Sequence, residues 1–214
     1  MNLRQIIDIV REEVGDTKRP YLVSDTMMAY YANRVETMAA RQARLIVETQ
    51  EIPVSAGEPT VDIDPKIISI RRARISTNPM PLAYRKVRDM DERYPGWDTT
   101  VMQSIPGVLV TDYASNQARL YPAPQADATL YLTVTRGPAA EMAEDEDEPE
   151  INARYHYGLI DGMKWLITSK EDSDLYDAKM AKMALDSFIA EFGPVISAVD
   201  EQYEFENYHD IGER

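Results

Sequence analysis

Hydrophobic residues recur with a helical period near the start of the chain. Leu3, Ile6, Ile7, Val10 and Val14 fall on one face, which predicts a short amphipathic helix over Leu3–Val14. Gly15 follows at the position that suits a left-handed C-cap.

The next pattern is longer, and it predicts one continuous helix over Ser24–Gln50. Ser24 and Asp25 are good N-cap residues, and no Gly or Pro interrupts the stretch. Its apolar stripe consists of Met28, Tyr31, Val35, Met38, Leu45 and Ile46. Pro53 and Gly57 then end helical structure.

Helical periodicity returns at the far end of the chain, where we expect two helices, Ile151–Thr168 and Asp172–Phe192. Gly158 and Gly162 are one turn apart on the first, which permits the close approach of another backbone. On the second, we expect Met180 and Met183 to fill gaps in the core beside the apolar stripe. Gly193 and Pro194 end this helix.

The middle of the chain instead favours short strands separated by turn residues. Thr60–Asp64 alternates β-branched and acidic residues, and Lys66–Ile75 reads as a stronger strand whose alternation slips between Arg72 and Arg74. Asp89–Tyr94 predicts a helical turn before Pro95 and Gly96. The further strand candidates are Leu82–Lys86, Val108–Tyr113, Gln117–Tyr121 and Thr129–Thr135.

Together these elements predict an α+β chain that is mainly α, with a small antiparallel β module inserted into a helical bundle. We expect the bundle to comprise residues 1–51 and 150–194, the β module 52–138, an acidic loop 139–149 and an extended C-terminal tail 195–214. The residues expected to be buried between helices are Val35, Met38, Leu45, Leu159, Met163, Leu166, Leu185 and Phe188.

The charge of the chain is concentrated in its last third. The net charge is −14, yet residues 1–140 hold 17 basic and 17 acidic side chains, whereas residues 141–214 hold 6 and 20. Seven carboxylates lie in Glu141–Glu150, a run typical of a solvated, mobile loop. Such a surface repels the phosphates of DNA. The alternative interpretation is that the charge serves only solubility.

Catalytic and metal-binding patterns are weak. There is no cysteine and there are only two histidines, of which His156 is expected to be packed or hydrogen-bonded and His209 lies in the tail. The acidic run lacks the glycine turn of a calcium loop. No apolar run is long enough to span a membrane, and the N-terminus lacks the apolar core of a signal peptide. We therefore expect no catalytic residue, no cofactor, no metal and no membrane partner.

The only basic concentration lies in the β module. Its members are Arg71, Arg72, Arg74, Arg85, Arg88 and Arg93. Arginines on a sheet can meet phosphates, but acidic protein partners or neighbouring subunits fit them equally well.

A series of short motifs gives the middle of the chain a more specific signature. Residues 94–97 read YPGW after the acidic stretch DMDER, and LYPAP follows at 120–124. Then come the strand TLYLTVTRGP, the acidic loop, PEINARYHYGLIDGM and a helix pair. In this order the chain, from residue 1 to about 194, resembles the head-to-tail adaptor (connector) proteins of tailed bacteriophages, the short-tailed phages in particular. In fold terms, Trp97 is expected to anchor the module on the helices, and Pro122 and Pro124 to prevent strand pairing.

The resemblance implies a structural virion protein in the neck or tail, made in the host cytoplasm, rather than an enzyme. It implies a ring of twelve copies under the portal protein, which extends the DNA channel without specific DNA binding. The ring would offer a platform to a downstream tail tube or nozzle protein and to tail fibres. The alternative hypothesis is a carboxylate-dependent hydrolase that cuts cell-wall glycans during phage entry, and a further one is a cytosolic binding module.

The tail, Val195–Arg214, follows a clean helix stop and carries six acids and one arginine. It nevertheless keeps Tyr203, Phe205 and Tyr208. Tyr203 and Phe205 are two apart and so point the same way along an extended strand. We therefore predict that these three aromatics bind the portal or a neighbouring subunit, with a solvated tail as the alternative.

Overall fold

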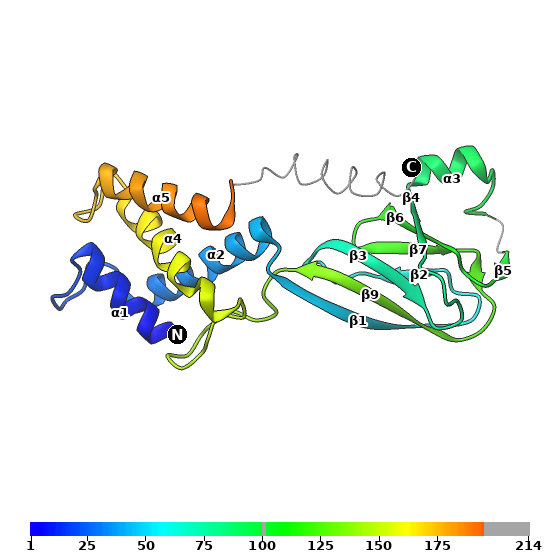
Figure 1. Ribbon diagram of the computed structural model, residues 1–214, viewed down its shortest axis with the longest axis horizontal. Helices are drawn as coiled ribbons and strands as arrows, with labels where there is room; N and C mark the ends of the chain where they lie inside the picture. The colour runs from blue at the N-terminus through cyan, green and yellow to red at the C-terminus, as the bar shows by residue number, and fades with distance from the viewer. Residues whose placement is uncertain (100–101, 195–214) are drawn as a thin grey trace. The chain divides into compact units, whose positions relative to one another are not determined.

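A computed structural model describes residues 1–99 and 102–194 (Figure 1). The described residues form five helices and three small sheets, and 36% of these residues are helical and 26% lie in strands. The fold is therefore mixed, and the prediction of a mainly α chain is corrected. The chain divides into two compact units, a helical unit of residues 1–46 and 137–194 and a β unit of residues 47–136.

The helical unit contains α1 (Leu3–Val14), α2 (Asp25–Ala43), α4 (His156–Thr168) and α5 (Ala178–Phe192), with a 3-10 turn at Ala153–Tyr155. Asn2 and Gln5 form a capping box at the start of α1, and Gly15 ends that helix with φ of 79°. Because α4 contacts α1, α2 and α5, it is the central helix of the unit.

The long helix predicted over Ser24–Gln50 is wrong in its last quarter. Ser24 caps α2 as expected, but α2 ends at Ala43, and Arg44 takes a left-handed φ of 50°. Ile46–Val54 is strand β1, in which burial alternates residue by residue. The sequence IVETQEIPV is rich in β-branched residues, and this composition prevails over the helical spacing that places Leu45 and Ile46 on one stripe with Met38.

The helix predicted over Asp172–Phe192 begins later, at Ala178, because Asp177 is the N-cap. The Asp177 carboxylate accepts hydrogen bonds from the N–H groups of Lys179 and Met180 at 2.9 Å each. Asp172 and Ser173 lie in the turn before it.

The core of the helical unit confirms five of the eight predicted residues, namely Val35, Leu159, Met163, Leu166 and Phe188. Met38 and Leu45 are only partly buried against that core, and Leu185 is also only partly buried. Met183 is wrongly predicted as core filler, since 61% of it is exposed.

Gly158 and Gly162 permit the close approach of side chains rather than of a backbone. A Cβ at Gly158 would lie 2.5 Å from the ring of Phe192, and one at Gly162 would lie 2.4 Å from Val35 Cγ1. Because both positions lack a Cβ, side chains of α5 and α2 pack directly against the backbone of α4.

Two of the three sheets form a sandwich in the β unit. The three-stranded sheet has the order β1–β9–β3, with β9 at Ala128–Arg136 and β3 at Ile67–Ile75. The four-stranded sheet has the order β2–β7–β6–β4, and these strands span Thr60–Asp62, Gln117–Tyr121, Val108–Ala114 and Ala83–Arg85. Leu130 and Leu132 of one sheet share a core with Leu109 and Leu120 of the other.

Two strand pairs correct the prediction of a purely antiparallel module. The pair β4 and β6 is parallel, and so is the pair β5 (Gln103–Ser104) and β8 (Ala123–Pro124). Strand β3 does slip against β9, but the shift lies between Ile70 and Arg72 rather than from Arg72 to Arg74, where the register is regular. The predicted turn of helix is α3, Val87–Arg93.

Candidate functional site

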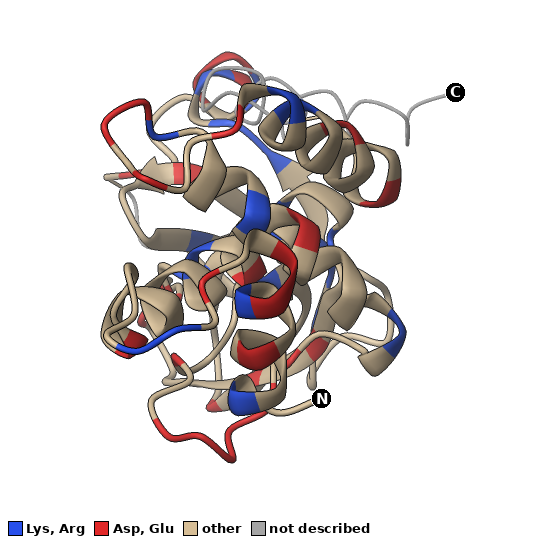
Figure 2. Cartoon of the chain, turned by 90° about the vertical axis from the view of Figure 1, so that its left-hand side faces the viewer, with Lys and Arg blue, Asp and Glu red and all other residues tan. Residues whose placement is uncertain are grey.

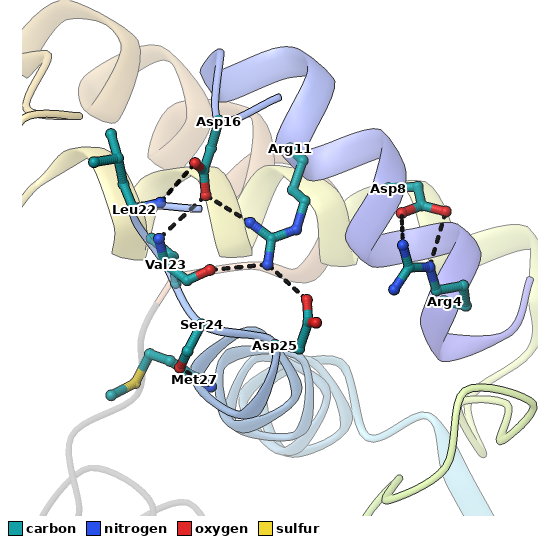
Figure 3. Close-up of polar contacts among 9 residues, drawn as sticks. All are labelled: Arg4, Asp8, Arg11, Asp16, Leu22, Val23, Ser24, Asp25 and Met27. Atoms are coloured by element: carbon teal, nitrogen blue, oxygen red, sulfur yellow. Dashed lines mark hydrogen bonds and ion pairs between the residues drawn. The ribbon is translucent and has the colours of Figure 1, made fainter. Parts of the chain in front are cut away.

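A buried arginine organises one end of the helical unit (Figure 3). Arg11 of α1 is 3% exposed, and its Nη1 donates to Asp16 Oδ2 at 2.6 Å. Its Nη2 donates to the Val23 carbonyl at 2.8 Å and to Asp25 Oδ1 at 2.7 Å. The Asp16 carboxylate also accepts the N–H groups of Leu22 and Val23. These bonds join the end of α1, the following loop and the start of α2.

This cluster is a scaffold rather than a ligand site. The guanidinium of Arg11 lies 3.8 Å from the centroid of the Tyr21 ring, and the carboxylate of Asp16 is almost completely buried. The Arg11 and Asp16 charges are buried and face each other and the backbone, and the exposed carboxylate of Asp25 is already paired with Arg11.

The acidic segment after β9 is hydrogen-bonded to α1. Asp147 accepts from the N–H of Leu3 at 2.7 Å, and Asp145 accepts from the N–H of Arg4 at 3.1 Å, in both cases through the backbone carbonyl. These are N–H groups of the first turn of α1, which have no partner within the helix. The side chain of Asp147 accepts from the N–H groups of Glu144 and Ala143, which hold the pKa of that carboxyl below its usual value.

Helix α2 binds the two ends of the same segment. Asn33 exchanges two hydrogen bonds with the backbone of Met142, at 2.9 and 2.8 Å. The Glu36 carboxylate is 1% exposed and accepts the N–H groups of Glu150 and Ile151. Most carboxylates of the run are exposed. Figure 2 colours the acidic residues on the loops of this unit red. The backbone of this loop is nevertheless hydrogen-bonded to α1 and α2 at Met142, Asp145, Asp147 and Glu150.

His156 is packed and hydrogen-bonded, as predicted. It is 2% exposed, and its Nε2 lies 3.0 Å from the Ile151 carbonyl oxygen. Because a carbonyl only accepts, Nε2 carries the hydrogen and Nδ1 accepts from the Met1 amine at 2.9 Å. Burial lowers the pKa of His156. His209 lies outside the described residues.

Two carboxyl groups have a raised pKa, as a glycosidase acid would, but neither is placed for that role. Burial raises the pKa of Glu36, whose oxygen is already engaged by two backbone N–H groups. Burial also raises the pKa of Glu191, and Asp161 adds to the effect. Asp161 is itself paired with Lys164 at 3.2 Å, so this pair does not offer a free nucleophile.

Residues 1–99 and 102–194 contain no group of three His, Cys, Asp or Glu side chains arranged to hold a metal ion. None of the helices in these ranges combines the length and the apolar character that crossing a membrane requires.

Trp97 anchors a helix, but that helix is α3 of the β unit. The turn at Pro95 and Gly96 forms as predicted, with Gly96 at φ of 81°. Trp97 is 4% exposed and packs with Met90 of α3 and Val110 of β6, and its Nε1 donates to Asp91 at 2.9 Å. The YPGW motif therefore packs α3 against the four-stranded sheet within the β unit.

The prediction that the LYPAP prolines prevent strand pairing is wrong for Pro124. Pro124 belongs to β8 and pairs with Ser104, and its carbonyl accepts the N–H of Gly57 at 2.7 Å. Proline lacks a donor but keeps its acceptor, so it can join a ladder through its carbonyl.

The six arginines fall into two groups. Arg71, Arg72 and Arg74 are exposed on β3. Arg85, Arg88 and Arg93 lie on β4 and α3, where Arg88 forms an exposed ion pair with Glu92 at 3.3 Å.

Large apolar side chains are exposed on the helices. Tyr157 of α4 is 69% exposed, Met183 of α5 is 61% and Tyr30 of α2 is 55%. Sequence reasoning missed Tyr30 and Tyr157 as surface residues, although their positions beside the apolar stripes contained the signal. Tyr203, Phe205 and Tyr208, the predicted partner-binding residues, lie outside the described residues.

A family model described as SU10 adaptor protein matches residues 1–205. No curated protein matches the chain.

Proposed function

The chain belongs to the SU10 adaptor protein family of phage head-to-tail adaptors, and from this we propose that it forms a ring under the portal. As a phage adaptor it is a structural protein of the virion, and the family is not one of enzymes. The proposal adds the finer points: twelve copies bind one another and the portal, extend the DNA channel and present a platform to tail tube, nozzle or fibre proteins.

The observation that carries the proposal is the family match, which spans both units and nearly the whole chain. Two further features support it. The helices expose large apolar side chains such as Tyr157 and Met183, which neighbouring subunits could cover. Glu36, a buried carboxylate with a raised pKa like that of a catalytic acid, instead accepts hydrogen bonds from backbone N–H groups.

Charge supports the passage of DNA without binding. The net charge of −14 derives from residues 141–214, and Figure 2 shows acidic residues gathered on loops and helices of the helical unit. A lumen of that sign repels phosphates, so DNA would slide through it rather than adhere.

The tail is proposed to provide a contact to the portal or to a neighbouring subunit through Tyr203, Phe205 and Tyr208. An extended peptide with spaced aromatics is suited to a groove or a sheet edge. Each tail would bind weakly, and a ring of tails would bind strongly through multivalency.

The test is sedimentation velocity of the purified protein alone and mixed with its portal. We expect a large closed species, either from the protein itself or only when the portal is present. A protein that remains monomeric and does not bind portal would refute the adaptor ring. The hydrolase alternative predicts instead that purified protein releases sugars from cell-wall glycan, with activity lost in Glu191→Gln.

A further inference from the structure

An outward face of the β unit is rich in arginine. We call it the arginine face and define it as Arg71, Arg72, Arg74, Tyr131 and Thr133. In the register of β3 and β9, Arg72 is opposite Thr133 and Arg74 is opposite Tyr131. The intervening pair, Ala73 and Leu132, is buried in the sandwich core, so the arginine face points away from it.

The charges on this face are not neutralised within the described chain. Arg71 Nε donates to the Thr135 hydroxyl at 3.0 Å, and the Arg74 guanidinium lies 5.1 Å from the centroid of the Tyr131 ring. Within residues 1–99 and 102–194, none of the three arginines forms an ion pair with a carboxylate. Arg85, by contrast, donates from Nη1 to the Tyr84 carbonyl at 3.2 Å. The arginine face therefore presents three guanidinium groups that lack an acidic partner.

The same chain supplies a segment of matching chemistry. Val195–Arg214 carries six carboxylates and one arginine, together with Tyr203, Phe205 and Tyr208. Guanidinium groups bind carboxylates in a bidentate manner and stack on aromatic rings, so Glu204 and Glu206 beside Tyr203 and Phe205 suit such a face. Twenty residues can span up to about 66 Å when extended, which is enough to reach another copy.

We propose that the arginine face of one copy binds the segment Val195–Arg214 of a second copy. This inference rests on the proposed ring, and it selects a neighbouring subunit over the portal as the partner of the tail. Because every copy contributes one acidic segment and one arginine face, the contact repeats head to tail around a ring, as a heterologous interface does. It also keeps the arginines covered, so that they do not bind DNA in transit.

The first experiment uses the absence of native cysteine. Full-length Arg72→Cys and full-length Glu204→Cys, with different affinity tags, are mixed, assembled on portal-containing heads and oxidised. A disulfide requires Cα atoms within about 7 Å, so it reports direct contact, and the two tags show that it joins different copies. The matched control is Arg88→Cys, an exposed arginine of the same unit outside the arginine face. We expect a disulfide between differently tagged copies with the first pair and not with the control.

The second experiment reverses charge. Arg71→Glu with Arg74→Glu should weaken subunit association about tenfold, the sum expected for a few exposed charge pairs. Added Glu204→Lys and Glu206→Lys in the same chain should restore it, whereas Arg88→Glu should have no effect. If the two arginine substitutions acted by misfolding the protein, two further substitutions would not restore association. Restoration therefore indicates a direct contact between the arginines and Glu204 and Glu206.

The outcomes separate the two proposals. If wild-type protein docks as a ring but position 72 forms no more disulfide than position 88, the inference is wrong and the ring stands. The inference is also wrong if the tail cysteine instead joins to portal, or if the reversed arginines change DNA retention but not subunit association. If the wild-type protein does not dock at all, the proposed function itself is wrong.

Discussion

The two units of the chain reach stability by different routes. The β unit is one continuous stretch whose two sheets enclose aliphatic side chains such as Leu109, Leu120 and Leu132. The helical unit is built from two segments separated by that stretch, and polar contacts join the segments, with Asn33 and Glu36 of α2 bound to the backbone of residues 142–151. The comparison indicates that, in the interrupted unit, hydrogen bonds to the backbone of the returning segment add to the apolar core that both segments share.

The largest expected effect concerns a buried ion cluster of the helical unit. Arg11→Met leaves the carboxylate of Asp16 buried without its counter-ion, which should lower the free energy of unfolding by about 3–5 kcal/mol. The matched control is Arg4→Met on the same helix, whose pair with Asp8 is exposed and should contribute no more than about 0.5 kcal/mol. Urea denaturation followed by circular dichroism measures both. Equal midpoints for the two variants would contradict the structural role of Arg11.

Core truncations should show that each unit has its own core. Leu159→Ala in the helical unit and Leu132→Ala in the β unit each remove a fully buried side chain and should cost about 2–5 kcal/mol. Leu185→Ala, at a half-buried position, should cost less. Hydrogen exchange measured by mass spectrometry should place the loss of protection in the unit that carries the substitution. Loss spread equally over both units would refute their independence.

A glycine substitution tests the close packing around α4. A Cβ at Gly162 would meet Val35 Cγ1 at 2.4 Å and the ring of Phe188 at 3.0 Å. Gly162→Ala should therefore cost about 1–3 kcal/mol, even though Ala favours the helix. Gly107→Ala in the β unit is the control, since nothing lies within 4 Å of its added Cβ. A thermal melt in which the Gly162 variant equals the wild type would show that the side chains move aside easily.

Many features of the two units can be predicted from the sequence, but the end of α2 and the long-range backbone contacts of the helical unit cannot. The caps at Ser24 and Gly15 and the aliphatic positions of α4 follow from local pattern, and the structure confirms them. The end of α2 does not, because Leu45 and Ile46 satisfy a helical stripe and a strand equally well over so short a window. The backbone contacts of residues 142–151 join positions more than a hundred residues apart, and no local signal encodes them.

The smallest expected effect is the pH dependence of stability that arises from His156, which is hydrogen-bonded to Met1 and to the Ile151 carbonyl. The folded-state pKa of His156 lies below its usual value, so the unfolded chain binds the proton more readily. Stability from this residue is then complete above about pH 6.5 and is lost as pH falls through that value towards the lower folded pKa. Melting temperatures from pH 7.5 to 5.5 should fall more for wild type than for His156→Gln, whose amide can still donate to the Ile151 carbonyl. Parallel curves would show that His156 does not titrate in this range.

The central claim is that this phage adaptor acts as a ring between the portal and the tail. Electron microscopy of portal-containing heads incubated with the purified protein tests it most directly. We expect a closed ring of extra density under the portal, coaxial with the channel, with twelve repeats. Heads that gain no density, or that bind the protein away from the portal, would contradict the account.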